Sequence, residues 1–164
     1  MGNSQNQKIL VAYFSAQGAT ARAAKAIAKA VGGTLFEIRP REPYTDDDLN
    51  WTNPGSRVSR EHAQGGPEIE LAVNAPSDFK DYGTVFLGFP IWWYTAAWPV
   101  DRFASANDFT GKRVVVFCTS GGSPLGDSCR RLSKLAGSGT WVEGARFSSG
   151  TPESEIAAFA RKAL

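Results

Sequence analysis

Residues 9 to 20 read ILVAYFSAQGAT. The first six are continuously apolar, which predicts a β-strand buried on both faces of its sheet. The next six hold two hydroxyls, an amide and a single glycine, and no charge. Apolar residues then recur at helical spacing until Gly32 and Gly33, which end the helix. The stretch therefore predicts a strand, a polar turn and a helix, the repeating unit of a parallel α/β sheet.

The same alternation continues along the chain. Four further apolar runs predict strands at residues 35–38, 85–89, 114–118 and 140–147, the last one interrupted by Gly144. Helices are predicted over residues 99–107, 125–136 and 152–164, with Thr151 as the N-cap of the last. We therefore expect one α/β domain over residues 1–164, with helices on both faces of a five-stranded parallel sheet.

Two segments depart from this pattern. Residues 1–7 are polar and predict a weakly ordered tail without a signal peptide. Residues 39–76 are punctuated by Pro and Gly and predict a long excursion with one or two short helices, which in a compact domain is usually functional or mobile. The single histidine, His62, lies in this excursion, and we do not assign it a catalytic role.

Charge and cysteine content exclude several classes of function. Eighteen Lys and Arg stand against 16 Asp and Glu, and a net charge of +2 does not favour nucleic acid or a membrane surface as the partner. No apolar run is long enough to span a bilayer. Cys118 and Cys129 have neither CxxC nor metal-ligand spacing, so we expect no metal site, no disulfide framework and a reducing, cytoplasmic setting.

Ligands of a parallel sheet bind beyond the carboxyl ends of its strands. The first loop at that edge, residues 15–20, opens a helix, where unpaired N–H groups and the helix dipole favour an anion. Ser15, Gln17 and Thr20 add side-chain donors, and Gly18 allows close approach to the backbone. These neutral donors predict phosphate binding, although a plain strand-to-helix turn explains the loop equally well.

The second loop places Trp92, Trp93 and Tyr94 in a row, with Trp98 four residues on. Consecutive side chains of an extended segment point to opposite sides, so the three cannot all enter one core. We expect at least one ring to stay exposed, as in a binding site. Trp98 and one of the tandem tryptophans are interpreted as core residues.

The third loop, residues 119–123, reads TSGGS. Gly121 and Gly122 remove side-chain bulk and permit either close backbone approach to a flat ligand or positive φ. A phosphate cradle, an aromatic cluster and a glycine pair at one sheet edge suit a flat, conjugated, phosphorylated ligand. Flavin mononucleotide (FMN) is the first candidate.

These loops resemble the FMN loops of the flavodoxins. The resemblance rests on YFSAQGAT at residues 13–20, GFPIWW at residues 88–93, the third loop and WVEGARF at residues 141–147, and it covers nearly the whole chain. It implies a flavodoxin-like three-layer α/β/α sandwich whose five-stranded parallel sheet has the strand order 2-1-3-4-5. It also implies a monomeric, low-potential electron-transfer protein that works between a reductase and an acceptor enzyme.

The resemblance also implies which residues bind FMN. The phosphate would be held by Ser15, Gln17, Gly18, Ala19 and Thr20. One side of the isoalloxazine would be lined by Pro90, Ile91, Trp92, Trp93 and Tyr94. The pyrimidine side would meet Thr119, Ser120, Gly121 and Gly122. The flavin would supply the chemistry, so no side chain is expected to be catalytic.

Two departures from the family pattern matter. Family members often have glycine where this chain has Tyr94, so a turn that needs positive φ there would be strained. Many members are also markedly acidic, whereas this chain is slightly basic, which implies a different partner surface or a role other than a general electron shuttle.

Two alternatives stay open. One is an FMN-dependent NAD(P)H or quinone reductase on the same fold, in which residues 39–76 would form a lid. We favour an insertion packed against the sheet for that segment. The other is a cofactor-free interaction module. The chain lacks the GxGxxG fingerprint of dinucleotide folds and the Gly-Lys-Ser/Thr of a P-loop, so other nucleotide folds fit less well.

Overall fold

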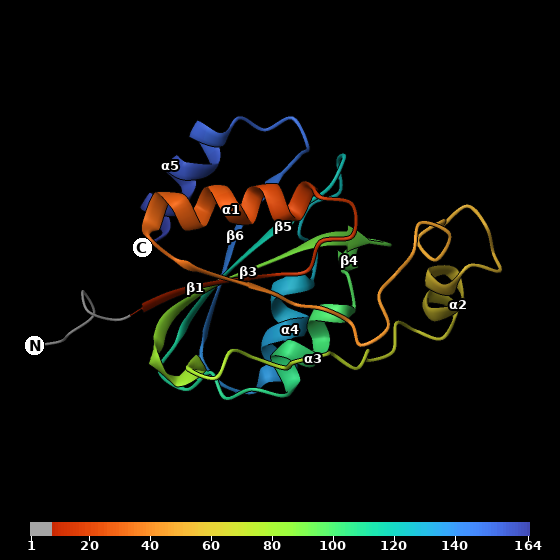
Figure 1. Ribbon diagram of the computed structural model, residues 1–164, viewed down its shortest axis with the longest axis horizontal. Coiled ribbons are helices and arrows are strands. Elements are labelled where there is room, and N and C mark those ends of the chain that lie inside the picture. Colours follow the sequence, from red (N-terminus) through yellow and green to blue (C-terminus); the bar gives the residue numbers. More distant parts are fainter. Residues whose placement is uncertain (1–7) are drawn as a thin grey trace, which may run out of the picture.

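The computed structural model describes residues 8–164, so the tail predicted at residues 1–7 lies outside the described residues. Figure 1 shows three layers: a twisted sheet with α1 and α5 on one face and α3 and α4 on the other. Within the described residues, every helix is too short or too polar to pass through a lipid bilayer.

The predicted strand order is confirmed, with one addition. The five parallel strands lie in the order β2-β1-β3-β5-β6. They are β1 (Lys8–Tyr13), β2 (Thr34–Glu37), β3 (Tyr82–Trp92), β5 (Arg113–Thr119) and β6 (Thr140–Phe147). The sheet has six strands rather than five, because β4 (Thr95–Ala96) turns back and pairs antiparallel with the end of β3.

Both faces of the three central strands β1, β3 and β5 are buried, which accounts for their nearly continuous apolar runs. Val11 of β1 and Phe117 of β5 pack on one face, together with residues of α1 and α5. Leu10 of β1 and Val116 of β5 pack on the opposite face, together with residues of α3 and α4. Successive side chains of these three strands thus enter different cores, and no alternation of polar residues appears in their sequences.

The four helices that cover the sheet lie where the sequence predicts them, with shifted ends. They are α1 (Ala19–Val31), α3 (Pro99–Ser105), α4 (Ser128–Ala136) and α5 (Glu153–Ala163). The predicted N-cap Thr151 is wrong: Pro152 occupies that position and has no side-chain cap. The Thr151 hydroxyl instead accepts a hydrogen bond of 2.8 Å from the Ser148 N–H, closing the turn before the helix.

Gly144 bends β6 without ending it. The pairing of β5 with β6 shifts register between Val116 and Phe117, and Gly144 is the residue left out of the pairing. A Cβ at this position would stand 2.3 Å from the carbonyl oxygen of Val116. The glycine is therefore required by a β-bulge inside a continuous strand.

The excursion of residues 39–76 extends beyond the carboxyl ends of the strands, where Figure 1 shows α2 (Arg57–Ala63) standing apart from the sheet. Its two ends are joined by backbone hydrogen bonds, of 2.8 Å from Arg41 N–H to Glu70 and of 2.9 Å from Ala72 N–H to Arg39. A single 3-10 turn, Phe79–Asp81 (η2), follows it and leads into β3.

Candidate functional site

A cavity of about 720 Å³ opens at the carboxyl ends of β1, β3 and β5, within the size range of small-molecule sites. Most of the predicted site residues line it: Gln17, Ala19, Thr20, Pro90, Ile91, Trp92, Trp93, Tyr94, Thr119, Ser120 and Gly121. Ser15, Gly18 and Gly122 lie in the same loops but outside this lining. Within residues 8–164, no residue that lines the cavity carries a charge.

Ser15 organises the turn between β1 and α1. Its Oγ accepts hydrogen bonds of 3.1 Å from the N–H groups of Gly18 and Ala21. Gly18, the N-cap of α1, has φ of 101°, a conformation that a side chain would strain. Because Ser15 Oγ accepts both bonds, its own O–H proton remains available as a donor.

Thr20 and Thr119 join this turn to the neighbouring strand. Their Oγ1 atoms lie 2.6 Å apart, and both side chains are buried. In such a pair one hydroxyl donates to the other, so one O–H proton is left over. Both residues line the cavity, so this proton can serve a ligand there.

The start of α1 supplies further donors. The N–H groups of Ala19 and Thr20 belong to its first turn, which lacks intrahelical partners, and no other partner is found for them among residues 8–164. No acidic side chain stands in this turn to occupy them. Together with the hydroxyls and the exposed Gln17 amide, they form an uncharged cradle suited to a phosphate.

The second loop is a tight hairpin and not the extended segment that its sequence suggests. Trp92 pairs with Thr95, which leaves Trp93 and Tyr94 as a two-residue turn. Both have positive φ, 46° and 70°, as in type I′ turns, at a cost of roughly 1–2 kcal/mol for each. The strain expected at Tyr94 is thus present, and Trp93 shares it.

The hairpin is held from the α4 side by Arg131. Its Nε and Nη2 donate to Thr95 Oγ1 (3.1 Å) and the Ala96 carbonyl (2.9 Å), while Nη1 pairs with Asp101 at 2.7 Å. Thr95 in turn donates to Asp127 Oδ1 at 2.9 Å. These contacts fix β4, and with it the strained turn, against the body of the protein.

Trp98 is a core residue, as predicted, whereas Trp92 and Trp93 are both half-buried and both line the cavity, so neither belongs wholly to the core. Trp98 is 3% exposed, and Trp92 packs edge-on against it at 5.0 Å between ring centroids. Trp92 also meets Phe14, at 5.5 Å. Tyr94 is 79% exposed and lines the cavity, as does the half-buried Trp93. The expectation of at least one exposed ring is confirmed.

The third loop offers fewer free backbone groups than its sequence suggests. The Ser120 N–H donates to the Phe147 carbonyl at 3.0 Å, and the Ser120 carbonyl accepts from Arg146 at 3.1 Å. A Cβ at Gly121 or Gly122 would meet no protein atom within 4 Å, and neither glycine has positive φ. The chain's own packing therefore does not require glycine here, whereas a ligand lying against Gly121 would.

Several lining residues were not predicted from the sequence. Leu49, Trp51 and Val58 come from the excursion, Ala16 and Ser123 from predicted loops, and Ser148 and Ser149 from the loop after β6. The only local signal was Trp51, a lone tryptophan in a polar stretch. The others reach the cavity through the path of the folded chain, which their local sequence does not indicate.

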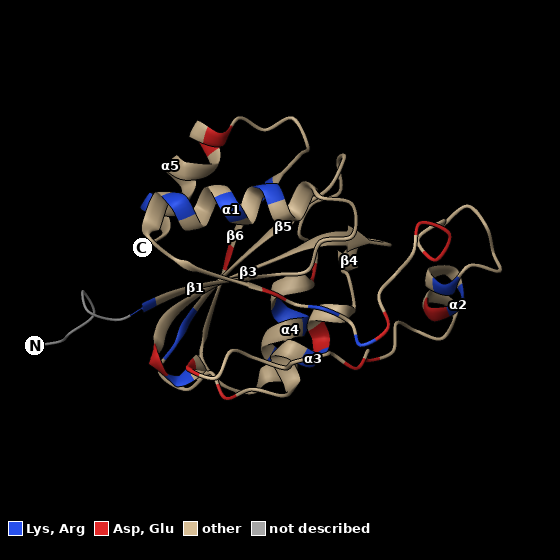
Figure 2. Cartoon of the chain, in the orientation of Figure 1, with Lys and Arg blue, Asp and Glu red and all other residues tan. Residues whose placement is uncertain are grey.

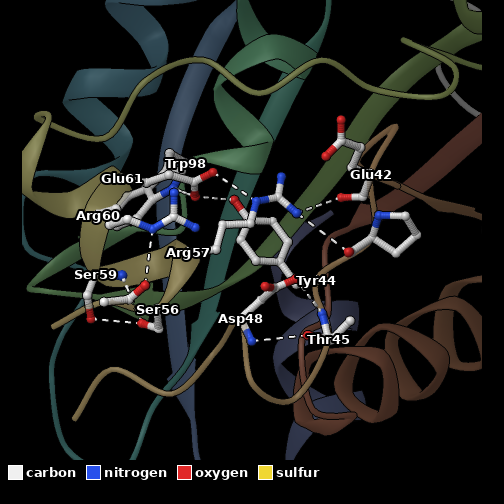
Figure 3. A network of polar contacts seen from close by, with 12 residues as sticks. Glu42, Tyr44, Thr45, Asp48, Ser56, Arg57, Ser59, Arg60, Glu61 and Trp98 are labelled. Atoms are coloured by element: carbon white, nitrogen blue, oxygen red, sulfur yellow. Dashed lines mark hydrogen bonds and ion pairs between the residues drawn. The ribbon is translucent and has the colours of Figure 1, made fainter. Parts of the chain in front are cut away.

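Glu61 of α2 anchors the excursion, as Figure 3 shows. Its carboxylate accepts from the Tyr44 hydroxyl (2.5 Å), the Trp98 indole N–H (2.9 Å) and Arg57 Nε (3.0 Å). The Arg57 guanidinium lies 3.8 Å from the centroid of the Tyr44 ring and donates to the Glu42 carbonyl. Burial, and then the bond to Glu61, raise the pKa of Tyr44, which keeps this hydroxyl a donor.

The excursion also reaches the cavity wall directly. The His62 ring stacks on Trp93 at 4.1 Å with only 6° between the planes. Val58 is buried beside Trp98, and Trp93 packs against this cluster. These contacts pack α2 on Trp93 and Trp98 and not on the sheet, against which the favoured interpretation placed the insertion, and His62 serves in them as a stacking partner.

No other chemistry is evident among the described residues. Between residues 8 and 164, no group of three His, Cys, Asp or Glu side chains could hold a metal ion. Cys118 and Cys129 are free and buried. Burial raises the pKa of Cys118 to about 12, so its thiol stays protonated and unreactive.

Comparison with known proteins yields a family and close structural relatives. The sequence matches the family model of the flavodoxins over residues 8–163. No curated protein matches the chain significantly. A proposed flavoprotein from Bacteroides eggerthii DSM 20697 is 39% identical, with 97% of this chain and 99% of that chain covered and a TM-score of 0.83.

Two further crystal structures are similar. A proposed flavoprotein from Bacteroides uniformis ATCC 8492 is 37% identical, covers 95% of this chain and 99% of its own, and has a TM-score of 0.86. A flavoprotein in complex with FMN from Lactobacillus acidophilus NCFM is 23% identical, covers 94% and 99%, and has a TM-score of 0.66. At this lower identity the likeness concerns the fold.

Proposed function

This chain belongs to the flavodoxin family, and we propose that it binds FMN and carries electrons between redox partner proteins. The family, together with the FMN complex of the Lactobacillus relative, supports FMN as the cofactor. The observation that carries the proposal is the convergence of the loops after β1, β3 and β5 on one cavity.

The donor set of this cavity fits the two ends of FMN. The uncharged cradle at the start of α1 suits the phosphate, because helix N–H groups and hydroxyls can hold an anion without a basic residue. Trp93 and Tyr94 offer rings to the isoalloxazine. At Gly121 the backbone is open to a flat ligand, since nothing of the protein fills the place of its missing side chain.

Bound FMN would supply the redox chemistry. The chain's own residues would hold and orient it: the N–H groups of Ala19 and Thr20 would bind the phosphate, and the Trp93–Tyr94 turn would bound the ring. Arg131 and Glu61 would act indirectly, since they fix the hairpin and the excursion that form the walls of the cavity. The exposed Tyr94 would stand between the cofactor and a docking partner.

The setting of the protein forms part of the proposal. We place it in the cytoplasm as a monomer, with a reductase as electron donor and an acceptor enzyme downstream. Two cysteines that are both free and buried are typical of a reducing compartment. The net charge of +2, with basic and acidic residues both spread along the chain (Figure 2), favours partners without the strongly basic docking surface that acidic flavodoxins attract.

A second candidate, an FMN-dependent reductase of quinones or similar acceptors, is favoured by one observation. Leu49, Trp51 and Val58 bring apolar surface from the excursion into the cavity. Such surface could receive a small aromatic acceptor beside the cofactor. Oxidation of NAD(P)H by the FMN-loaded protein, stimulated by a quinone, would support this function over that of a carrier.

The first experiment is a visible absorption spectrum of the purified protein before and after addition of FMN. Flavin bands that persist through gel filtration, with quenched flavin fluorescence, are expected. Absence of both bands and uptake would overturn the proposal. The elution volume in the same gel filtration reports whether the protein is a monomer.

A further inference from the structure

Trp51 is exposed in a way that its surroundings do not explain. It is 70% exposed, whereas the other four tryptophans are buried or half-buried. Among residues 8–164, its ring takes part in no aromatic pair and its indole N–H donates no hydrogen bond. It nevertheless lines the same cavity as Trp93 and Tyr94. A large exposed ring at a cavity is a feature of binding sites.

The backbone around Trp51 is held in place without help from its side chain. Thr45 and Asp48 exchange hydrogen bonds of 3.0 and 3.1 Å, each from a backbone N–H to the other's side chain. Asn50 Oδ1 accepts from the Thr52 N–H at 3.2 Å. The Trp51 carbonyl accepts from Ser59 Oγ at 3.3 Å, which ties the turn to α2.

Two apolar residues add to the part of the cavity wall that Trp51 forms. Leu49 and Val58 line the cavity as well. The Val58 N–H donates to the Asp48 carbonyl at 2.9 Å, so this part of the wall is fixed to the turn before Trp51. Val58 also packs with Trp98, against which Trp93 lies. The excursion and the second loop therefore form one continuous surface.

We infer that Trp51, with Leu49 beside it, contacts the isoalloxazine ring of FMN, so that the excursion is a fourth element of the cofactor site. This rests on the proposed function, FMN binding at this cavity. The ring of Trp51 provides apolar, planar surface and no charge, which matches the conjugated ring of the flavin and not its phosphate. Contact would bury both surfaces, and this burial strengthens binding.

The test is titration of the cofactor-free protein with FMN and with riboflavin, which lacks the phosphate. Trp51→Ala is expected to weaken both by the same factor, on the order of tenfold. Trp51→Phe is expected to recover most of this loss. Thr20→Val, in the cradle, is expected to weaken FMN more than riboflavin. Val73→Ala is the matched control, because Val73 lies in the same excursion, is 58% exposed and does not line the cavity.

Fluorescence provides a readout independent of affinity. The emission of Trp51 is the tryptophan fluorescence of the wild type minus that of Trp51→Phe. Because the indole of Trp51 would lie against the flavin, FMN should quench this emission. The cofactor-free Trp51→Ala protein should unfold close to the wild-type temperature, since the residue is 70% exposed and the substitution removes little buried surface.

The outcomes separate this inference from the proposed function. If wild type binds FMN and Trp51→Ala binds both flavins equally well, the role of Trp51 is overturned and FMN binding stands. A loss confined to FMN would also overturn it, because the effect would then act on the phosphate. Failure of wild type to bind either flavin would overturn the proposed function itself.

Discussion

The Oγ1 atoms of Thr20 and Thr119 lie 2.6 Å apart in a buried position, so the first turn of α1 is joined directly to the last residue of β5. This bond links the loop that would hold the phosphate to the loop that would meet the flavin ring. The two loops are therefore fixed relative to each other before any ligand is bound.

We expect Thr20→Val and Thr119→Val each to lower the free energy of unfolding by about 1 kcal/mol, because each leaves the other hydroxyl without its partner. The double variant should lose no more than either single variant. Urea unfolding of the cofactor-free protein measures this. Losses that add in full would show that the two hydroxyls do not act as a pair.

Gly121→Ala should weaken FMN binding several-fold while leaving the cofactor-free protein as stable as wild type or slightly more so. The added methyl group meets no protein atom within 4 Å, and it also restricts the unfolded chain. Gly122→Ala is the control, because Gly122 does not line the cavity. Fluorescence titration and thermal unfolding check both variants, and equal affinities would argue against backbone contact at Gly121.

Asp101 makes stability dependent on pH. Burial raises its pKa from the ordinary 3.8 to about 6, against the opposing effect of Arg131, and its Oδ1 finds no hydrogen-bond partner among residues 8–164. Because the pKa of Asp101 is higher in the folded state than in the unfolded state, protonation of this carboxyl stabilises the fold. The stabilisation is complete below pH 3.8 and is lost as pH rises through about 6. Relative to Asp101→Asn, wild type should therefore lose about 2 kcal/mol between pH 4 and pH 7. Urea unfolding at these pH values measures the difference, and a constant difference would contradict the assignment.

Glu61→Ala should detach the excursion. Removal of the carboxylate leaves the Tyr44 hydroxyl, the Trp98 indole N–H and the partly buried Arg57 without their acceptor. We expect a loss of about 3 kcal/mol, with faster proteolysis within residues 39–76. Glu70→Ala is the control, since its ion pair with Arg41 is exposed and worth about 0.5 kcal/mol or less. Equal proteolysis of the two variants would show that Glu61 is no anchor.

Much of the fold could be predicted because the central strands β1, β3 and β5 contain long apolar runs. A run such as residues 9–14 has one explanation in a chain of this length, a strand covered on both faces, and the helices between such runs enforce a parallel sheet. Even Gly144, whose glycine suggested an interruption, only shifts the register of β6.

The hairpin at Trp93 and Tyr94 could not be predicted from local preference. Bulky residues disfavour positive φ, so the sequence suggests an extended segment at this point. The turn forms because contacts with residues distant in sequence offset its conformational free energy: Arg131 and Asp127 bind β4 from another part of the chain. Trp51 was missed for a related reason, since long-range contacts of α2, such as those of Glu61 with Trp98 and of His62 with Trp93, bring the excursion to the cavity.

The uncharged lining of the cavity has a consequence for how binding should respond to ionic strength. A phosphate held by Lys or Arg loses affinity as salt screens the ion pair, with a Debye length of about 10 Å at 0.1 M. Here hydrogen bonds from N–H and O–H groups at contact distance would hold the anion, and screening acts only on the helix dipole and on Arg22 and Arg146, which lie behind the lining and bind the Ser149 and Ser120 carbonyls. The affinity for FMN should therefore remain nearly level from dilute buffer to molar salt, so that this protein would keep its cofactor under conditions that separate it from charged partners.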